Sequence, residues 1–234
     1  MAASLTADHL YRFFYVGDDE TLALQGISLQ LNRGEIVAVT GPSGSGKSTL
    51  MSCLAGLDEP DGGTVRVDGE RLSRRSEEDR ARIRGESIGV LYQQNNLIGH
   101  LTVAQNVELA RQIGSSGDHL RSPEGDKTRR ADVLERCGIA HRARHRPAQL
   151  SGGELARAGL AVALANDPPI VIADEPTGEL DSVTAAGVIN LLRDTAAQGS
   201  AVLVVTHSDE VAAAADRRIA LRDGKIESEE AGRR

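Results

Sequence analysis

The stretch that decides the fold is "EIVAVTGPSGSGKSTLMSCLAGL", residues 35–57, in which a β-branched run, a glycine-rich turn and a helix-type segment follow one another. The turn, "GPSGSGKST" (41–49), matches the pattern G-x-x-x-x-G-K-[ST] between a predicted strand and a predicted helix, as that pattern requires. Glycines let the backbone wrap closely around a phosphate chain, and the following helix presents its positive end to it. The stretch therefore predicts a phosphate-binding P-loop.

Two side chains of this loop have predicted roles in chemistry. Lys47 is expected to hold the β- and γ-phosphates of a nucleotide and to stabilise charge as a phosphate bond breaks, and Ser48 is expected to bind Mg²⁺. The other predicted phosphate-binding residues are Gly41, Pro42, Ser43, Gly44, Ser45, Gly46 and Thr49.

A P-loop needs an acidic partner, which the apolar strand "IVIAD" (170–174) supplies at its end. Asp174 is predicted as the metal-side carboxylate. Because neighbouring side chains on a strand alternate, Glu175 is expected to point elsewhere and to polarise the attacking water. His207 ends the strand "AVLVVTH" (201–207) at the same carboxyl edge of the sheet, which favours a contact with the γ-phosphate.

The rest of the chain predicts one α/β unit. Strand signals such as "LALQGISLQL" (22–31) give way to a helical pattern and then return, ending in a hairpin at "RRIALRDGKIE" (217–227). We expect an ATPase-type core at 1–92 and 151–234, with a mixed sheet carrying an antiparallel β edge, and an inserted helical lobe at 93–150. The glycine- and serine-rich segment 114–128 is predicted to be a mobile surface loop.

Charge and composition limit the partners. The formal net charge of -7 and the pI of about 5.4 oppose a non-specific grip on nucleic acid or an anionic membrane. The chain has no run of about 18 apolar residues and no secretion-type start, so a chain that is soluble by itself is expected. Cys53 and Cys137 lie apart from other ligand-type residues and are predicted to be reduced, packed thiols.

Six motifs in order resemble those of the ATP-binding cassette (ABC) ATPases over essentially the whole chain. The P-loop resembles the Walker A motif, "YQQNNL" (92–97) the Q-loop, "LSGGE" (150–154) the signature, "IVIADE" (170–175) the Walker B motif, "GELD" (178–181) the D-loop, and His207 the switch histidine. The resemblance implies a P-loop NTPase fold, hydrolysis of ATP with Mg²⁺, and Gln93 as a further nucleotide and metal contact.

The resemblance also implies a divided active site. In that family two copies pack head to tail, and each signature meets the nucleotide held by the other copy. Ser151, Gly152, Gly153 and Glu154 are thus expected to bind the ATP of a second subunit in a homodimer, because the glycines permit close approach and the next helix directs its N-terminus at the phosphate. An ordinary N-cap serine is the alternative interpretation.

Four of the five Phe and Tyr residues lie in "YRFFY" (11–15). Adenine stacks on flat apolar faces, and counting back from the first strands favours Phe14 as the family's adenine contact, with Tyr15 second. The chain departs from the family pattern at Leu155 and Ala156, where glutamines are frequent, and at Val162 and Glu179. The first three changes remove polar groups expected near the signature.

The amino-acid sequences of residues 92–107 and 164–182 resemble those of the ABC subgroup that serves lipoprotein release, macrolide export and cell-division signalling. The resemblance implies a separate membrane permease with a large extracytoplasmic domain, contact with the membrane only through that permease at its cytoplasmic face, no nucleic acid, and a receiving groove at 94–113. The alternative is a soluble regulatory or nucleic-acid-associated ABC ATPase with low turnover. The basic patch "HRARHR" (141–146) is interpreted as a solvated face or a partner contact.

Overall fold

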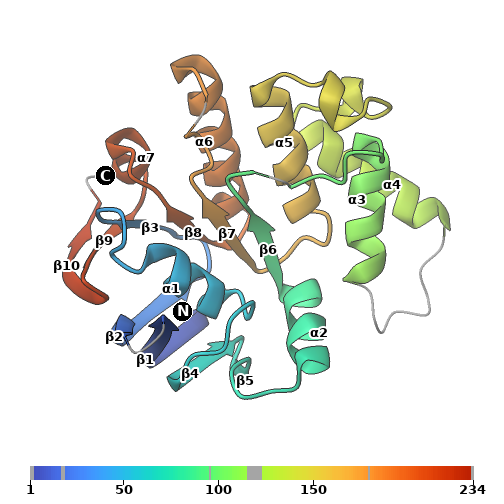
Figure 1. The fold of residues 1–234 in the computed structure, drawn as a ribbon. Helices are drawn as coiled ribbons and strands as arrows, with labels where there is room; N and C mark the ends of the chain where they lie inside the picture. The colour runs from blue at the N-terminus through green and yellow to red at the C-terminus, as the bar shows by residue number, and fades with distance from the viewer. Residues whose placement is uncertain (1–2, 17–18, 95, 115–122, 179, 233–234) are drawn as a thin grey trace.

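The structure is a computed structural model of the 234-residue chain and describes residues 3–16, 19–94, 96–114, 123–178 and 180–232. A six-stranded sheet in the order β10-β9-β3-β8-β7-β6 forms its centre (Figure 1). Five strands are parallel and β10 is antiparallel to β9. The strands are β3 (Ile36–Thr40), β6 (Ile88–Leu91), β7 (Ile170–Asp174), β8 (Ala201–Val205), β9 (Arg217–Arg222) and β10 (Lys225–Ala231).

The central strands β3, β7 and β8 are apolar up to their last residues because helices or strands cover both faces of the sheet. Val37 and Val39 pack in one core with α1 (Lys47–Leu54), whereas Ile36 and Ala38 pack in a second core on the other face. That second core includes residues of α5 (Gly152–Ala163), α6 (Ser182–Ala197) and α7 (Asp209–Ala213). Because β3, β7 and β8 are parallel, their carboxyl ends lie at the same edge of the sheet, between the two layers.

A second, antiparallel sheet in the order β2-β1-β4-β5 covers α1 from the other side (Figure 1). Its strands are β1 (Ala3–Val16), β2 (Asp19–Asn32), β4 (Gly62–Val67) and β5 (Glu70–Arg71). The predicted fold class is confirmed, with one refinement: only the β9–β10 hairpin forms an antiparallel edge of the main sheet, because the long β1–β2 hairpin pairs with β4 instead of with β3.

The remaining helices lie on the right of Figure 1, apart from α2 (Glu77–Ser87) below the sheet. They are α3 (Val103–Ile113), α4 (Pro123–Arg136) and the short 3-10 turns η1 (Ala140–Arg142) and η2 (Pro147–Gln149). The prediction of a loop over 114–128 is wrong from Pro123 onward, where α4 begins; residues 115–122 lie outside the described part of the chain. The division into a core and a lobe at 93–150 stays a prediction.

Both cysteines are free and buried, as predicted. Burial raises the pKa of the Cys53 and Cys137 thiols to about 12, so both stay protonated at neutral pH. Across the described residues, the structure has no helix that combines the length and the apolar character needed to span a bilayer.

Candidate active site

The P-loop has the backbone shape that its glycines predict. Gly46 precedes α1 in the left-handed region, at φ 99°, and a Cβ atom there would lie 2.5 Å from the carbonyl oxygen of Ala23. A Cβ atom on Gly41 would lie 2.2 Å from the carbonyl oxygen of Leu221. Both approaches exclude any side chain, so the loop is held closely between β2 and β9.

Lys47 is the first residue of α1 and curls back over the loop. Its Nζ donates to the carbonyl oxygens of Gly41 at 2.7 Å and Pro42 at 2.8 Å. The ammonium group therefore lies over the mouth of the loop, where a phosphate chain would meet it together with the backbone N–H groups.

A cavity of about 420 Å³ lies over this loop and is large enough for part of a nucleotide. Phe14 lines the cavity and is 40% exposed as a residue, which fits its predicted role as the aromatic face for adenine. Tyr15 is not among the described lining residues. The P-loop contributes Ser43, Gly44, Gly46, Lys47, Ser48 and Thr49 to the wall, and the turn of the terminal hairpin contributes Asp223 and Gly224.

Asp174 is the last residue of β7 and lies close enough to Lys47 to feel its charge. Burial raises the pKa of Asp174, the neighbouring Glu175 carboxylate raises it further, and the Lys47 ammonium opposes both. A carboxylate at this depth favours a compensating cation, either the lysine or a metal ion.

Glu175 does not belong to the strand that ends at Asp174, contrary to the reason given for its predicted direction. The strand ends at Asp174, and Glu175 takes a left-handed backbone conformation with φ 44°, so the alternation of a strand does not set its direction. Its N–H donates to the carbonyl oxygen of Val205 on β8 at 2.8 Å. The reason given for the direction of Glu175, alternation along a strand, was therefore wrong.

The Glu175 carboxylate is gripped by the residues that follow β8. It accepts a hydrogen bond from Thr206 Oγ1 at 3.0 Å and from the His207 main-chain N–H at 3.0 Å, and it lies 2.7 Å from His207 Nδ1. Its side chain is only 13% exposed. Thr206 was not predicted; its signal in the sequence is a hydroxyl that follows the apolar strand β8.

The signature begins α5 and forms a capping box. Ser151 Oγ accepts from the Glu154 N–H at 3.4 Å, and the Ser151 N–H donates to the Glu154 carboxylate at 2.9 Å. Arg142 Nε donates to the same carboxylate at 2.7 Å. The Ser151 N–H and Arg142 lower the pKa of Glu154 to about 2. Arg142, inside the basic patch, was missed as a support for the signature.

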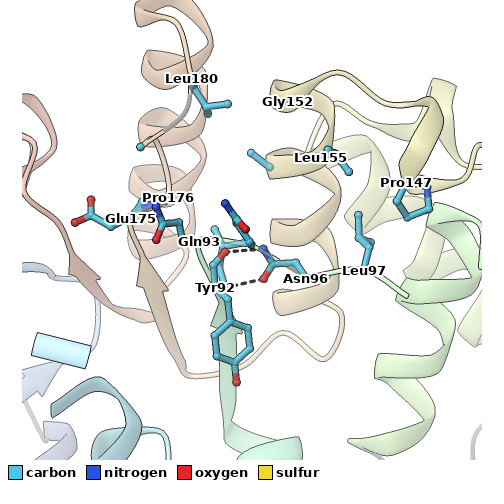
Figure 2. Close-up of a pocket in the computed structure, with 14 residues that line it drawn as sticks. Tyr92, Gln93, Asn96, Leu97, Pro147, Gly152, Leu155, Glu175, Pro176 and Leu180 are labelled. Atoms are coloured by element: carbon cyan, nitrogen blue, oxygen red, sulfur yellow. Dashed lines mark hydrogen bonds between the residues drawn. The ribbon is translucent and has the colours of Figure 1, made fainter. Parts of the chain in front are cut away.

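The signature residues do not line the P-loop cavity in the part of the chain that the structure describes. Gly152 instead lines a second cavity of about 380 Å³ with Gln93 and Glu175. Figure 2 shows Gln93 near the middle of this cavity and the Glu175 carboxylate turned away from it. Beside Gln93, the Tyr92 N–H donates to Asn96 Oδ1 at 2.7 Å and Asn96 Nδ2 donates to the Tyr92 carbonyl oxygen at 2.6 Å.

The predicted metal ligands suit Mg²⁺ by their chemistry. The hydroxyl of Ser48, the carboxylate of Asp174 and the amide of Gln93 offer the hard oxygen atoms that Mg²⁺ prefers. Among the described residues no three His, Cys, Asp or Glu side chains gather into a cluster that could hold a metal ion. Ser48 lines the P-loop cavity, whereas Gln93 lines the second one.

Comparison with known proteins decides the family. The ABC transporter family model matches residues 24–178, which include the P-loop, the signature and the Asp174–Glu175 pair. The chain belongs to the ABC transporter family. The predicted fold and ABC ATPase class are thereby confirmed, the curated relatives below are of the predicted macrolide-export type, and the role of each site residue stays a prediction.

Two curated relatives show the kind of protein this ABC cassette resembles. The probable syringafactin export ATP-binding/permease protein SyfD of Pseudomonas syringae is 42% identical over 96% of the chain, which covers 34% of SyfD. The macrolide export ATP-binding/permease protein MacB of Burkholderia thailandensis is 43% identical over 92% of the chain and 32% of its own length. The chain thus spans about a third of these relatives.

Among solved structures, the ABC cassette is similar to a dimeric post-hydrolysis state of the ATP-binding cassette MJ0796 bound to ADP and Pi. The TM-score is 0.90 at 37% identity, over 98% of this chain and 99% of that chain. A nucleotide-free ATP-binding cassette, at 22% identity and a TM-score of 0.83, shows the same fold.

Proposed function

We propose that this ABC cassette binds Mg·ATP between two copies of itself and hydrolyses it to drive an exporter-type permease at the cytoplasmic face of a membrane. The main support for this proposal is that the P-loop and the signature lie apart within one chain. The P-loop cavity holds Lys47 and Ser48, and the Ser151–Gly152 end of α5 lines none of it. The dimeric MJ0796 cassette supports a second copy as the source of the missing half.

The chemistry follows from the groups at the edge of the sheet. Lys47 and the loop N–H groups bind the β- and γ-phosphates and stabilise the charge that develops on them. Glu175 accepts a proton from the attacking water, and Thr206 and His207 orient its carboxylate. Ser48 and Asp174 would hold Mg²⁺, which supplies charge neutralisation at the phosphate oxygens.

The second copy supplies the N-terminal end of α5. Ser151 and the glycines after it bring a hydroxyl and the positive helix end to the γ-phosphate. The Glu154 carboxylate accepts hydrogen bonds from Arg142 and from the Ser151 N–H of its own subunit. We therefore assign Glu154 to the support of the signature, where it holds the cap in shape without touching ATP.

The dimer test uses the Glu175→Gln variant, which keeps the shape of the site and slows hydrolysis. We expect ATP with Mg²⁺ to convert this variant from monomer to dimer in size-exclusion chromatography with light scattering. The matched control, Glu175→Gln combined with Lys47→Ala, should stay monomeric because it has lost the phosphate contact. A Glu175→Gln variant that stays monomeric at saturating ATP, alone and on membranes, would contradict the divided site.

The permease contact is proposed at the second cavity. Its wall carries apolar side chains, including Leu97 from the segment between β6 and α3 and Leu155 from α5. Residues 103–113 of α3 are not among the described lining residues, so the receiving surface is smaller than the predicted 94–113 groove. An apolar helix end of a permease fits such a wall.

Pull-down from solubilised membranes tests this contact. Leu97→Asp should abolish co-purification of a permease while the isolated cassette retains its basal ATPase, and Glu210→Gln, at an exposed position of α7, serves as the control. A permease captured as a second polypeptide supports the separate-chain arrangement. A permease recovered only as part of one long polypeptide, as the names of SyfD and MacB suggest for those proteins, would contradict it.

A regulatory cassette with low turnover is the second candidate. Leu155 and Ala156 line the second cavity beside Gly152 and make its wall apolar next to the signature. Phosphate release measured with and without the membrane fraction separates the two functions. A transporter motor is stimulated by its membrane partner, whereas a regulatory module closes on ATP with little release in either condition.

A further inference from the structure

We propose that Arg12 is a positioning residue for the nucleobase: its guanidinium group backs the Phe14 ring and fixes that ring in the orientation that stacks on adenine. This inference rests on the proposed role of Phe14 and goes beyond it, because it assigns the group that holds the aromatic face in place. Arg12 and Phe14 are two residues apart on β1, at a point where the pairing with β2 shifts register between Arg12 and Phe13, and their side chains meet there.

The contact is close. Arg12 Cζ lies 4.8 Å from the centroid of the Phe14 ring, within the distance at which a cation is attracted to an aromatic face. Phe14 lines the P-loop cavity, whereas Arg12 is not among its described lining residues. The guanidinium group thus supports the ring without occupying the cavity, and the exposed part of the ring remains available to a base.

Arg12 is itself held by two carboxylates. Its Nε and one terminal nitrogen donate to the two oxygens of Asp58 at 2.8 and 2.9 Å, and its other terminal nitrogen donates to Asp61 at 3.0 Å. The same Asp61 oxygen accepts the Phe13 N–H at 2.8 Å. A planar guanidinium group bound on two edges is fixed in rotation, which is the property needed to hold a ring lying against its face.

These carboxylates connect the ring to the P-loop helix. The Asp58 N–H donates to the Ser52 carbonyl oxygen within α1 at 3.1 Å, and α1 begins at Lys47. The group that would bind the phosphates and the ring that would bind the base are therefore joined through Arg12 and Asp58. This connection fixes the distance between the phosphate-binding loop and the ring that would bind the base.

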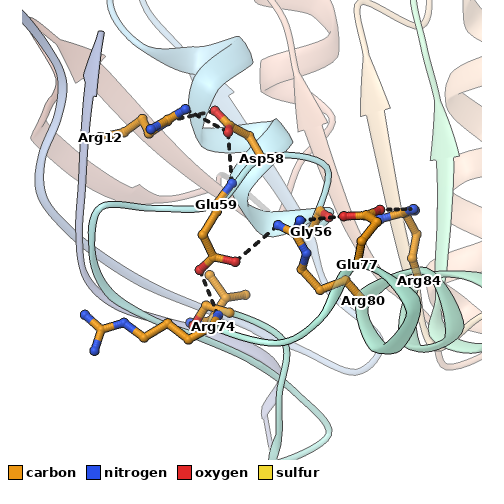
Figure 3. Close-up of polar contacts among 10 residues, drawn as sticks. Arg12, Gly56, Asp58, Glu59, Arg74, Glu77, Arg80 and Arg84 are labelled. Atoms are coloured by element: carbon orange, nitrogen blue, oxygen red, sulfur yellow. Dashed lines mark hydrogen bonds and ion pairs between the residues drawn. The ribbon is translucent and has the colours of Figure 1, made fainter.

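The same polar network supplies a matched control (Figure 3). The Glu59 N–H donates to Asp58 at 2.9 Å, and Glu59 in turn accepts a hydrogen bond from Arg80 at 3.1 Å. Arg80 is 15% exposed and Arg12 22% exposed, so both arginines are similarly enclosed. The described contacts of Arg80 are with carboxylates, and they do not include the ring.

The experiment compares ADP with inorganic pyrophosphate, both with Mg²⁺, by isothermal titration calorimetry on the intact chain. ADP carries a base and pyrophosphate does not, so the ratio of their Kd values reports the base contact. We expect Arg12→Gln to weaken ADP about two- to tenfold, the range of a cation–π contact, and to leave pyrophosphate unchanged. Arg80→Gln should leave both affinities unchanged even where it lowers Tm.

A double-mutant comparison separates a ring-mediated effect from any other. Phe14→Ala should weaken ADP, and adding Arg12→Gln to Phe14→Ala should weaken it no further, because Arg12 acts through the ring. An additional loss in the double variant, or an Arg12→Gln variant that binds ADP like the parent, would overturn the inference. If Phe14→Ala itself leaves the Kd ratio unchanged, the proposed role of Phe14 fails first.

Arg12→Lys keeps the test decisive if Arg12→Gln does not fold. Lysine keeps the charge but cannot bind Asp58 and Asp61 as a planar fork while lying flat against a ring. Folded Arg12→Lys should therefore weaken ADP while pyrophosphate binding is kept. Parent-like ADP affinity in this variant would overturn the inference.

Discussion

The carboxylate of Glu175 lies 2.7 Å from Nδ1 of His207 and accepts the main-chain N–H of the same residue at 3.0 Å. The two residues follow adjacent parallel strands, β7 and β8, whose pairing places Asp174 beside Val205. The contact is therefore built into the register of the sheet. Because the His207 N–H belongs to the main chain, Glu175 keeps this donor in any His207 variant except proline, in addition to Thr206 Oγ1.

We expect Glu175→Gln to bind ATP like the parent and to hydrolyse it about 10²–10³ times more slowly, the usual cost of a lost preorganised group. Glutamine has the same size, and its amide oxygen can still accept from Thr206 and the His207 N–H, so the site keeps its shape. Phosphate release and equilibrium ATP binding measure the two effects. Glu210→Gln, on the exposed face of α7, is the control for the change of charge, and parent-like turnover in Glu175→Gln would refute its role as the base.

Thr206→Val should impair both stability and turnover. Thr206 is fully buried, its Oγ1 donates to Glu175, and the same atom accepts the Ser208 N–H at 3.0 Å. Valine keeps the volume but leaves a buried acceptor and a donor unsatisfied, which costs about 1–3 kcal/mol of unfolding free energy. Turnover should fall because Glu175 is held less firmly.

Thr206→Ser is the matched control, since it keeps the hydroxyl and removes only a methyl group. Urea denaturation and phosphate release should place it close to the parent. If valine and serine behave alike in both measurements, the hydroxyl does not orient Glu175.

The sequence could predict the P-loop, the Asp174–Glu175 pair and the signature because each is a run of neighbouring residues whose spacing alone determines local geometry. It could not predict that Thr206 and His207 hold Glu175. That contact depends on which strands are neighbours, β7 and β8, although 31 residues separate Glu175 from Thr206. The Arg12–Asp58 pair was missed for the same reason, at a separation of 46 residues.

Composition misled the prediction where packing decides the structure. Glycine, serine and charge predicted a loop over 114–128, yet a helix begins at Pro123 and its later residues Val133 and Leu134 are buried in the second core. Proline suits the first turn of a helix, which was the local signal available. Burial of two apolar side chains ten residues further on is a property of the fold and has no signal at Pro123 itself.

Gly153→Ala should destabilise the cassette, and Thr184→Ser should rescue it. A Cβ atom on Gly153 would lie 2.3 Å from Thr184 Cγ2, where α5 meets α6. Overpacking of this kind costs about 1–3 kcal/mol, and serine removes the clashing methyl group while it keeps the hydroxyl that binds Asp181 at 2.6 Å. Thermal unfolding of the single and double variants measures both effects.

Gly152→Ala is the contrasting variant, since among the described residues its Cβ atom would meet Leu180 alone, at an ordinary 3.6 Å. Its Tm should match the parent, while its ATP hydrolysis should fall because the added methyl group blocks approach to the nucleotide of the second copy. Full activity in Gly152→Ala would mean that this glycine does not face a partner's ATP.

The support of the signature should appear as an acid-dependent part of the stability. The pKa of Glu154 is lowered from 4.5 to about 2 by the Ser151 N–H and Arg142, so the folded state holds its proton less tightly than the unfolded state. The stability gained from the ionised carboxylate is therefore complete above about pH 4.5 and is lost as the pH falls toward 2. Glu154→Gln lacks this contribution, and the difference in unfolding free energy between it and the parent should shrink steadily as the pH falls through that window. Urea denaturation from pH 7 to pH 3 measures this difference. The difference in unfolding free energy between Arg142→Gln and the parent should also shrink, though less, because this variant lacks one of the two donors to the Glu154 carboxylate. A difference that stays constant down to pH 3 would show that the carboxylate does not hold the signature in the folded protein.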